Sequence, residues 1–298
     1  MTTGARALDT PGPPALEPDQ LERYLARIGY AGSRAPTLET LRALHRAHLL
    51  TIPYENLDIH LGRSLTVDPR VNVGKLCGTR GGWCYEMNGV FGAVLRTLGF
   101  DVHLLSGAVG REHRGDAAEA NHLVLRVNLG QPWIADVGFG DAFLEPLPLA
   151  PGTYRQDFLV YRVALDGERW TVFNHEHGGA DAFDFTLAPR TLGHFAAKCL
   201  DLSTSADSVF VQHLVLQRFV SAGLVTLRGA VLRHVRASGV DERTIENGDA
   251  WARAVEEEFG VVVPGVEALW DGVRARHLAW LASRQSLPDD APARPSSA

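Results

Sequence analysis

The spacing of apolar residues changes near residue 100 of this 298-residue chain, and the change limits the folds that the chain can adopt. Before that point apolar residues recur every three or four positions, as in 21–28 and 87–98, which is typical of helices with one buried face. After it, apolar and β-branched runs at 102–109, 122–127 and 133–137 are separated by Gly, Asn and Pro, which predicts antiparallel strands. Helices followed by strands predict an α+β fold rather than alternating βαβ units.

Local signals predict where these elements begin and end. Gly29 and Gly99 are expected to end the first and third helices, and Thr37 is expected to cap the second. A hairpin is expected around Arg228-Gly229-Ala230, with two more helices after it. The predicted division of the chain is a flexible leader (1–18), a helical bundle (19–99), a strand-rich part (100–205), a mixed part (206–285) and a flexible tail (286–298).

The composition is that of an ordinary globular protein, with 45% hydrophobic and 21% charged residues. A net charge of -6 argues against nucleic-acid binding through the overall field of the protein. Three cysteines are too few for a disulfide framework, residues 1–20 contain no apolar signal core, and no apolar run reaches the roughly 18 residues of a membrane span. We therefore expect a cytoplasmic protein without a membrane anchor, and the sequence leaves open whether identical copies associate.

The sharpest local feature is the run Arg80-Gly81-Gly82-Trp83-Cys84-Tyr85-Glu86-Met87-Asn88. Its two glycines precede a predicted helix, so Cys84 is expected in the first turn, where free N–H groups and the helix dipole favour a nucleophilic thiolate. The alternative is that Cys84 is a small buried apolar residue, which is also what we expect of Cys77 and Cys199. Residue type and position leave both interpretations of Cys84 open.

A nucleophilic thiol needs a base, and a predicted hairpin supplies one. His122 opens the run 122–127, and Asp136 lies near the end of the run 133–137. If the two runs pair around Leu129, His122 and Asp136 are directly opposite each other on one face, where the carboxylate can orient the imidazole. The alternative is that His122 is a hydrogen-bonded structural residue at the edge of an apolar strand.

Other candidate sites are weaker. Both histidines of His175-Glu176-His177 would share one face of a strand and could bind a metal, but no further ligand stands at a suitable spacing. The run Gly138-Phe139-Gly140 lacks the third glycine of a dinucleotide fingerprint, and the chain has no Gly-Lys-Ser/Thr phosphate loop. We therefore expect neither a metal nor a nicotinamide cofactor.

Around Cys84 the sequence resembles the active-cysteine signature of the arylamine N-acetyltransferases. His122-Leu123-Val124-Leu125 and Asp136-Val137-Gly138-Phe139-Gly140 are similar to the His and Asp segments of that family, in the same order. Ile52-Pro53-Tyr54-Glu55-Asn56-Leu57 resembles its Ile-Pro-Phe-Glu-Asn-Leu element, with Tyr in place of Phe. Ser203-Thr204-Ser205-Ala206-Asp207-Ser208-Val209-Phe210 resembles its Ser-Thr-Ser-Pro-x-Ser-x-Phe element, with Ala in place of Pro.

The resemblance implies a three-part fold: an N-terminal helical bundle, a central antiparallel β-barrel and a C-terminal α/β lid around a cysteine-protease-like core. It implies a catalytic triad of Cys84, His122 and Asp136. Carried over by motif, Glu55 and Arg80 would form a buried supporting ion pair. The residues that it implies for substrate binding are Tyr54, Gly138, Phe139, Gly140 and Phe210.

The implied reaction moves an acetyl group from acetyl-CoA, the cosubstrate, to a small aromatic amine, a hydrazine or a hydroxylamine. An acetyl-cysteine intermediate would make the reaction ping-pong, and the lid would shield that intermediate from water. Such chemistry is typical of the metabolism of xenobiotic amines. A basic cluster is expected near the phosphates of CoA, with Arg228, Arg233, His234 and Arg236 as its members.

Three alternatives stay open. A transglutaminase-like or papain-like hydrolase would use the same Cys, His and Asp. A macrolactam-forming amide synthase shares the arylamine N-acetyltransferase fold and joins an internal amine to a carrier-bound acyl thioester. A binding or structural module would contain Cys84 as an inert residue. Residue patterns do not separate the enzymes from one another, because one triad serves all of them.

Overall fold

The computed structural model describes residues 12–285, so most of the predicted leader and the whole predicted tail lie outside the described residues. The N-terminal part is helical, and Thr37 Oγ1 accepts a hydrogen bond from the Thr40 N–H at 3.2 Å, as the predicted cap requires. Gly29 and Gly99 follow helices with φ of +65° and +87°, which confirms both predicted helix ends. The elements are α1 (Pro18–Arg27), α2 (Leu38–Thr51), β1 (Tyr54–Glu55), α3 (Leu57–His60), α4 (Pro69–Leu76) and α5 (Cys84–Thr97).

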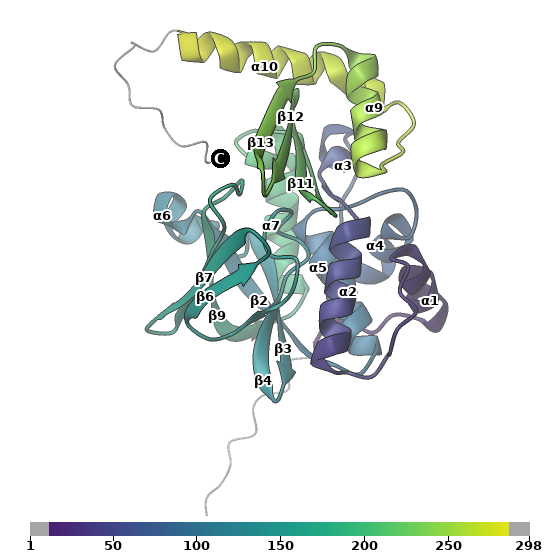
Figure 1. The fold of residues 1–298 in the computed structure, drawn as a ribbon, viewed down its shortest axis with the longest axis vertical. Helices are drawn as coiled ribbons and strands as arrows, with labels where there is room; N and C mark the ends of the chain where they lie inside the picture. Colours follow the sequence, from purple (N-terminus) through teal and green to yellow (C-terminus); the bar gives the residue numbers. More distant parts are fainter. Residues whose placement is uncertain (1–11, 286–298) are drawn as a thin grey trace, which may run out of the picture.

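The middle of the chain forms an antiparallel sheet that curves into a nearly closed barrel (Figure 1). Its strand order is β5-β4-β3-β2-β9-β8-β7-β6, so the hairpin predicted at 122–137 forms part of one wall. The elements are β2 (Asp101–Val109), α6 (Arg111–Arg114), η1 (Gly115–Ala118), β3 (His122–Leu129), β4 (Gln131–Ala135), β5 (Leu147–Pro148), β6 (Gly152–Gln156), β7 (Leu159–Asp166), β8 (Arg169–Phe173) and β9 (Ala182–Arg190).

The C-terminal part has a second antiparallel sheet, in the order β1-β10-β11-β12-β13, which lies above the barrel in Figure 1. The hairpin predicted around Gly229 is confirmed, since Arg228 pairs with Val231. The elements are α7 (Gly193–Thr204), α8 (Val209–Gln212), β10 (Val215–Val220), β11 (Gly223–Arg228), β12 (Val231–Arg236), β13 (Gly239–Thr244), α9 (Gly248–Phe259), η2 (Val266–Leu269) and α10 (Trp270–Gln285).

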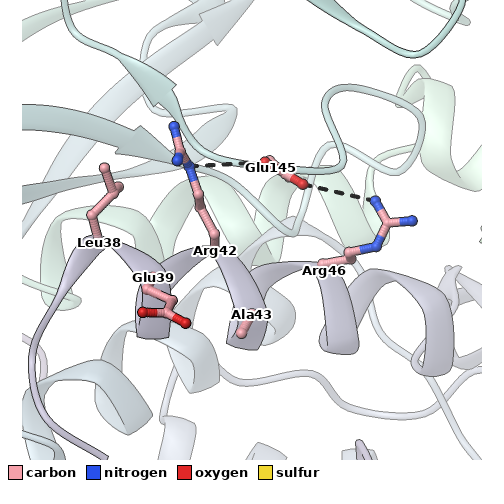
Figure 2. Close-up of a pocket in the computed structure, with 6 residues that line it drawn as sticks. All are labelled: Leu38, Glu39, Arg42, Ala43, Arg46 and Glu145. Atoms are coloured by element: carbon pink, nitrogen blue, oxygen red, sulfur yellow. Dashed lines mark ion pairs between the residues drawn. The ribbon is translucent and has the colours of Figure 1, made fainter. Parts of the chain in front are cut away.

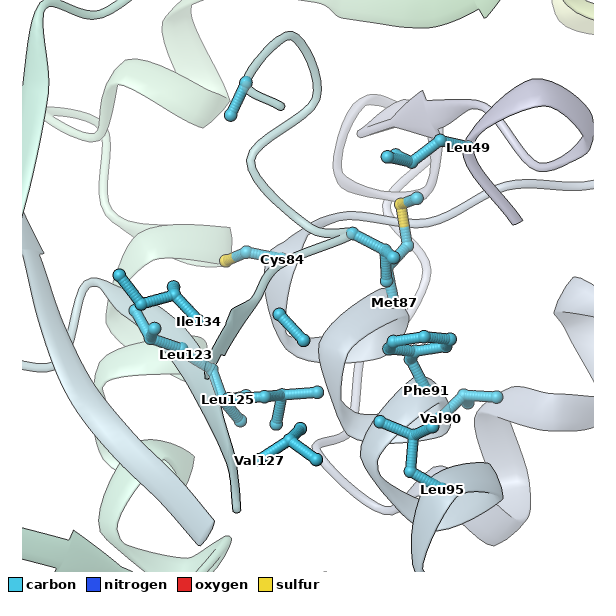
Figure 3. Packing of buried hydrophobic residues seen from close by; sticks show 14 of the residues in the cluster. Leu49, Cys84, Met87, Val90, Phe91, Leu95, Leu123, Leu125, Val127 and Ile134 are labelled. Atoms are coloured by element: carbon cyan, nitrogen blue, oxygen red, sulfur yellow. The ribbon is translucent and has the colours of Figure 1, made fainter. Parts of the chain in front are cut away.

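One large hydrophobic core joins the N-terminal helices to the barrel. Residues of α5 that include Val90 and Phe91 are fully buried, and they lie beside Leu125 and Val127 of β3 (Figure 3). The packing of α5 on β3 therefore brings the start of α5 close to the start of β3. This contact sets the position of the site described below.

The second sheet and the helices α9 and α10, which we call the lid, contain a smaller core of their own. This core lies between the sheet and α9 and includes Leu227 and Trp251. At the N-terminal end, Leu16 is buried and its N–H donates to Thr97 Oγ1 at 2.8 Å, so the described end of the predicted leader packs on the helical part. No helix between residues 12 and 285 is long and apolar enough to cross a membrane. The exact division of the chain at residues 99, 205 and 285 stays a prediction.

Candidate active site

Cys84 is the first residue of α5, as the sequence predicts. The residue before it, Trp83, is extended, and its N–H donates to the carboxylate of Glu86 at 3.2 Å. Lys75 holds that carboxylate from the other side, with Nζ 2.9 Å from Oε2. These contacts hold the first turn of α5 in place, and the first turn sets the direction of the Cys84 side chain.

The Cys84 thiol is buried, with only 3% of the residue exposed, and Sγ lies 3.9 Å from the carbonyl oxygen of Asn121. Burial raises the pKa of this thiol well above its ordinary value, although the amides of Tyr85 and Leu123 act to lower it. Burial of the thiol therefore opposes the thiolate that the helix start favours. Ionisation of Cys84 needs a base that accepts its proton.

His122 and Asp136 form a buried pair in which Nε2 of the imidazole donates to Oδ2 of the carboxylate at 2.5 Å. The predicted pairing is right but its register is wrong, because the hairpin turns at Gly130 and places Leu125 opposite Ala135. His122 and Asp136 are consequently diagonal rather than direct neighbours. A shift of the opposing residue by two keeps both side chains on the same face, which is why the contact forms anyway.

Asn88 is a site residue that the sequence analysis did not single out. Its Nδ2 donates to Oδ1 of Asp136 at 2.7 Å and to the Leu123 carbonyl at 2.6 Å, and its Oδ1 accepts from the Val137 N–H at 2.8 Å. Asn88 follows Cys84 by four residues on α5, and this spacing places both on one helix face. From the sequence, this spacing was the one indication that Asn88 lies next to the site. The same side chain thus ties α5 to both strands of the hairpin.

Two backbone contacts complete the surroundings of Asp136. The Gly138 N–H donates to Oδ1 of the carboxylate at 2.9 Å, and the Asp136 N–H donates to Nε2 of His45 at 3.1 Å. His45 in turn donates from Nδ1 to the Leu144 carbonyl, and burial lowers the pKa of His45 to about 4. His45 is therefore a neutral structural acceptor, and it holds the backbone of the carboxylate in place.

The run Gly138-Phe139-Gly140 lies directly against the start of α5. A Cβ on Gly138 would stand 2.8 Å from the Cys84 carbonyl oxygen, so only glycine allows this approach. Gly140 has φ of +89° and lies against the side chain of Gln217. Both glycines of the run have a steric reason to be glycine.

Aromatic rings surround the His122 imidazole. The ring of Phe139 meets it edge to face with centroids 5.3 Å apart, and Phe183 meets it at 5.2 Å. Phe183 lies on β9, which has no counterpart among the predicted strands, although Phe183, Phe185 and Leu187 alternate as strand residues do. That alternation was the signal that could have identified it.

The other two predicted substrate-binding rings, those of Tyr54 and Phe210, come from separate elements. The ring of Phe210 on α8 packs edge to face on the ring of Trp83, with centroids 5.3 Å apart. Trp83 directly precedes Cys84 in the chain. Tyr54 on β1 pairs with Gln217 on β10 and lies beside Gly140. The structure therefore brings the predicted aromatic residues to the neighbourhood of the glycine run and of Cys84.

A buried carboxylate that the sequence analysis missed joins the barrel to the lid. Asp141 accepts hydrogen bonds from Gln217 Nε2 at 2.8 Å, from the Gly179 N–H at 2.7 Å and from Asn174 Nδ2 at 3.3 Å. Burial raises the pKa of Asp141 to about 6. Gln217 belongs to β10 of the lid sheet, so Asp141 and Gln217 connect the two sheets beside Gly140.

A network of charged side chains lies next to the start of α5. Arg80 donates from Nε to Glu55 at 2.8 Å and from Nη2 to Asp58 at 2.8 Å, so the predicted partners Glu55 and Arg80 are in contact. Lys75 contacts Asp58 at 2.7 Å in addition to Glu86. Burial raises the pKa of Glu86 to about 7, against the opposing effect of Lys75. The five groups form one buried ion network.

The basic cluster predicted for CoA phosphates is not formed as a group. Arg233 and His234 are adjacent in β12 and point to opposite faces, because strand side chains alternate. Arg233 donates to the His177 carbonyl at 3.0 Å, whereas His234 pairs with Glu258 of α9 at 3.1 Å. Arg233 and His234 therefore do not act on one phosphate together.

His175-Glu176-His177 does not present free imidazole nitrogens at a shared point. His175 donates from Nε2 to the Asp141 carbonyl, and its Nδ1 accepts from the His177 N–H. Within residues 12–285 no group of three or more His, Cys, Asp or Glu side chains is arranged to hold a metal ion.

A surface depression of about 430 Å³ runs along α2 and is drawn in Figure 2. Glu145 spans it by pairing with Arg42 and Arg46 at 3.8 Å each. Its lining residues are Leu38, Glu39, Arg42, Ala43, Arg46 and Glu145, none of which belongs to the site around Cys84.

The sequence is similar to those of known acetyltransferases. A family model described as N-acetyltransferase matches residues 37–268. The chain is 34% identical over 254 residues to the arylamine N-acetyltransferase of Escherichia coli, a match that covers 82% of this chain and 89% of the relative. It is 31% identical to the arylamine N-acetyltransferase / N-hydroxyarylamine O-acetyltransferase of Salmonella typhimurium, over 83% of this chain and 90% of the relative.

The fold is similar to that of Mycobacterium marinum arylamine N-acetyltransferase, solved in complex with CoA, with a TM-score of 0.77 and 31% identity. The match covers 86% of this chain and 97% of that one. The predicted fold class, including its cysteine-protease-like core, is thereby confirmed. From its sequence match, its fold and the residues gathered at the start of α5, the chain belongs to the arylamine N-acetyltransferase family and is an acetyltransferase.

Proposed function

We propose that this enzyme moves an acetyl group from acetyl-CoA to an arylamine through an acetyl-cysteine intermediate at Cys84. The observation that carries the proposal is the buried hydrogen bond between His122 and Asp136, at the start of a strand whose preceding residue, Asn121, has its carbonyl oxygen 3.9 Å from the thiol of Cys84. The relatives are named for acetylation of arylamines, and one related structure contains CoA. Acetyl-CoA is therefore the proposed donor.

In the first half-reaction His122 accepts the Cys84 proton as Sγ attacks the thioester carbon. Because burial raises the pKa of the thiol, transfer of its proton to His122 favours the attack. A carbon–sulfur bond forms to Cys84, the bond to the CoA sulfur breaks, and His122 returns the proton to CoA. The amide N–H groups at the start of α5 stabilise the oxyanion.

In the second half-reaction an aromatic amine attacks the acetyl carbon while His122 removes its proton, and Cys84 leaves with that proton. Asp136 fixes the imidazole tautomer, since its carboxylate accepts the Nε2 proton and leaves Nδ1 for the reacting groups. The proposed acceptors include hydrazines and hydroxylamines. The Salmonella relative is named for O-acetylation of N-hydroxyarylamines as well.

The remaining predicted residues support these steps. Tyr54, Phe139 and Phe210 are the proposed aromatic walls for the acceptor, and Gly138 and Gly140 allow it to approach the backbone closely. Glu55 and Arg80 form the proposed supporting ion pair beneath the cysteine helix. We also propose a cytoplasmic location, because the free cysteines suit a reducing compartment. A role in xenobiotic metabolism is proposed because the relatives are named for the acetylation of arylamines.

Mass spectrometry after mixing with acetyl-CoA, without an amine, tests the intermediate. We expect a gain of about 42 daltons, one acetyl group, on the peptide that contains Cys84. Cys84→Ser should lose both the adduct and arylamine acetylation, whereas Cys77→Ser, which changes a partly exposed thiol at the end of α4, should keep both. An unmodified wild-type protein that still acetylates arylamines would refute the covalent route. Faster turnover of a bulky carrier-bound thioester than of acetyl-CoA would instead support an amide synthase.

A further inference from the structure

Tyr85, the residue that follows Cys84 on α5, has no role in the steps proposed above. Its side chain is fully buried, and its ring packs on those of Trp83 and Phe195 with centroids 5.0 Å and 5.9 Å apart. Its hydroxyl donates to the carbonyl oxygen of Ala120 at 2.7 Å. Burial raises the pKa of Tyr85 well above its ordinary value, so the hydroxyl stays protonated and remains a donor. This contact ties the first turn of α5 to the segment that leads into β3.

Ala120 has an unusual backbone conformation. Its φ is +63°, in the left-handed region that residues other than glycine seldom adopt, and the residue is buried. Among the non-glycine residues between 12 and 285, only Asp157 also has a positive φ. Such a conformation costs free energy and persists only where surrounding contacts hold it. The hydrogen bond from Tyr85 is a contact of this kind, since it fixes the carbonyl of Ala120.

The end of the strand ladder explains why the chain turns at this point. The pairing of β2 with β3 ends with Gly107 opposite His122. Two residues further along β2, the side chain of Asn121 takes the place of a partner strand for Val109. Its Oδ1 accepts from the Val109 N–H at 2.8 Å, and its Nδ2 donates to the Val109 carbonyl at 2.9 Å. The carbonyl of Ala120, which would face Val109 in a regular ladder, contacts α5 instead.

The segment held by these contacts belongs to the site. Asn121 follows Ala120, and its carbonyl oxygen lies 3.9 Å from Sγ of Cys84. His122 comes next, and its imidazole contacts Asp136. A change of the backbone angles at Ala120 would turn the Asn121 carbonyl away from the thiol and redirect the imidazole. Small displacements of this kind lower the rate of a reaction that depends on the mutual orientation of its groups.

We propose that Tyr85 is a positioning residue for acetyl transfer. Its hydroxyl holds Ala120 in the left-handed conformation and thereby sets how His122 faces the thiol of Cys84. The hydroxyl acts through the backbone of Ala120 and not on the substrate, because it is bonded to that carbonyl and its ring is covered by other aromatic side chains. The inference rests on the proposed function, in which His122 accepts the proton of Cys84.

Steady-state kinetics of Tyr85→Phe test the proposal, because phenylalanine keeps the ring and removes only the hydroxyl. We expect kcat for arylamine acetylation to fall about tenfold, the effect of one lost hydrogen bond. The KM for the arylamine should change by less than about twofold, since Tyr85 does not line the proposed acceptor walls. The matched control is Tyr161→Phe, which removes another buried hydroxyl that donates to an alanine carbonyl, that of Ala142, at 2.6 Å. This control should lose similar stability and keep kcat, and an equal kcat loss in both variants overturns the proposal.

A glycine at position 120 separates the positioning role from a purely structural one. Glycine adopts a positive φ without the steric cost of a Cβ, so the segment should need the hydroxyl less. In the Tyr85→Phe background, Ala120→Gly should therefore restore kcat to within about threefold of the wild type, when both are measured well below their Tm. A double variant whose kcat stays at the level of Tyr85→Phe would show that the hydroxyl does not act through the conformation of Ala120.

Alkylation of Cys84 by iodoacetamide at neutral pH gives a readout that needs no acetyl transfer. A carbon–sulfur bond forms, iodide leaves and the thiol proton passes to His122, so the rate depends on how the imidazole meets the thiol. We expect Cys84 to react about tenfold more slowly in Tyr85→Phe than in the wild type or in Tyr161→Phe. Equal rates in all three proteins overturn the positioning role. A wild type that is alkylated but forms no acetyl adduct would refute the proposed function instead, and the comparison of alkylation rates would still stand.

Discussion

Replacement of Asn88 by alanine tests how the buried carboxylate is held. In the wild type the Asn88 side chain makes three hydrogen bonds of 2.6 to 2.8 Å, to Asp136, to the Leu123 carbonyl and from the Val137 N–H. Alanine leaves all three partners buried without this contact. At about 1 kcal/mol for each of the two neutral bonds and about 2 kcal/mol for the bond to the carboxylate, the free energy of unfolding should fall by roughly 4 kcal/mol.

The same change should slow acetyl transfer. Without Asn88, Asp136 keeps the Gly138 N–H and His122 as partners but loses its anchor on the helix that contains Cys84. A loss of about 1.5 to 3 kcal/mol in the transition state corresponds to a roughly tenfold to hundredfold lower kcat. The KM for the arylamine should change little, because Asn88 does not line the proposed acceptor walls.

The assay compares steady-state arylamine acetylation with the rate of acetyl-enzyme formation, both well below the Tm of each variant. The matched control is Asn72→Ala, which removes another buried asparagine whose Nδ2 donates to a carbonyl, that of Thr66, at 2.9 Å. This control should lose stability but keep kcat. The reasoning fails if Asn88→Ala keeps kcat within about twofold, or if Asn72→Ala loses as much activity.

Two further predictions concern the loop after Asp136. In Gly138→Ala the new Cβ would stand 2.8 Å from the Cys84 carbonyl, so kcat/KM should fall by about a hundredfold, whereas Gly74→Ala, with open space around it, should keep its activity. The folded-state pKa of Asp141, about 6, lies above its ordinary value of 3.8, so its ionisation favours unfolding as the pH rises through this range. Relative to Asp141→Asn, the wild type should therefore lose roughly 2.4 kcal/mol of unfolding free energy between pH 4 and pH 7 in urea titrations. Parallel pH profiles of the two proteins would contradict this.

Local patterns in the sequence were enough to predict the helix that begins at Cys84 and the hairpin that presents His122. Both depend on neighbouring residues: two glycines before a helical period, and two apolar runs around a short link. The register of the hairpin was missed because the turn centres on Gly130, which has φ of +73°, rather than on Leu129. A glycine is the residue that most easily adopts this conformation, so the turn could have been placed there.

The partners of Asp136 could not be read in the same way. Asn88 meets Asp136 across 48 positions in the chain, and His45 meets its N–H across 91. The four-residue spacing from Cys84 places Asn88 on the same helix face but does not indicate which partner it has, and His45 lies on a helix among buried apolar neighbours without such a signal. Their function depends on how α2, α5 and the barrel wall pack, and single-sequence periodicity does not contain that information.

The reacting groups and the proposed acceptor walls share the large core, because Tyr54 is part of it and Phe139 and Phe210 pack against it. Cys84 is part of the large core shared by the helices and the barrel, and His122 and Asp136 are buried beside it. The lid sheet has a smaller core of its own, but it also contributes Phe219, Leu224 and Val235 to the large core, and Gln217 adds a hydrogen bond to Asp141. Substitutions in the smaller core, such as at Leu232, should therefore leave the imidazole and carboxylate in place, whereas substitutions at Phe219 or Val235 should disturb the site, because close-packed interiors transmit strain.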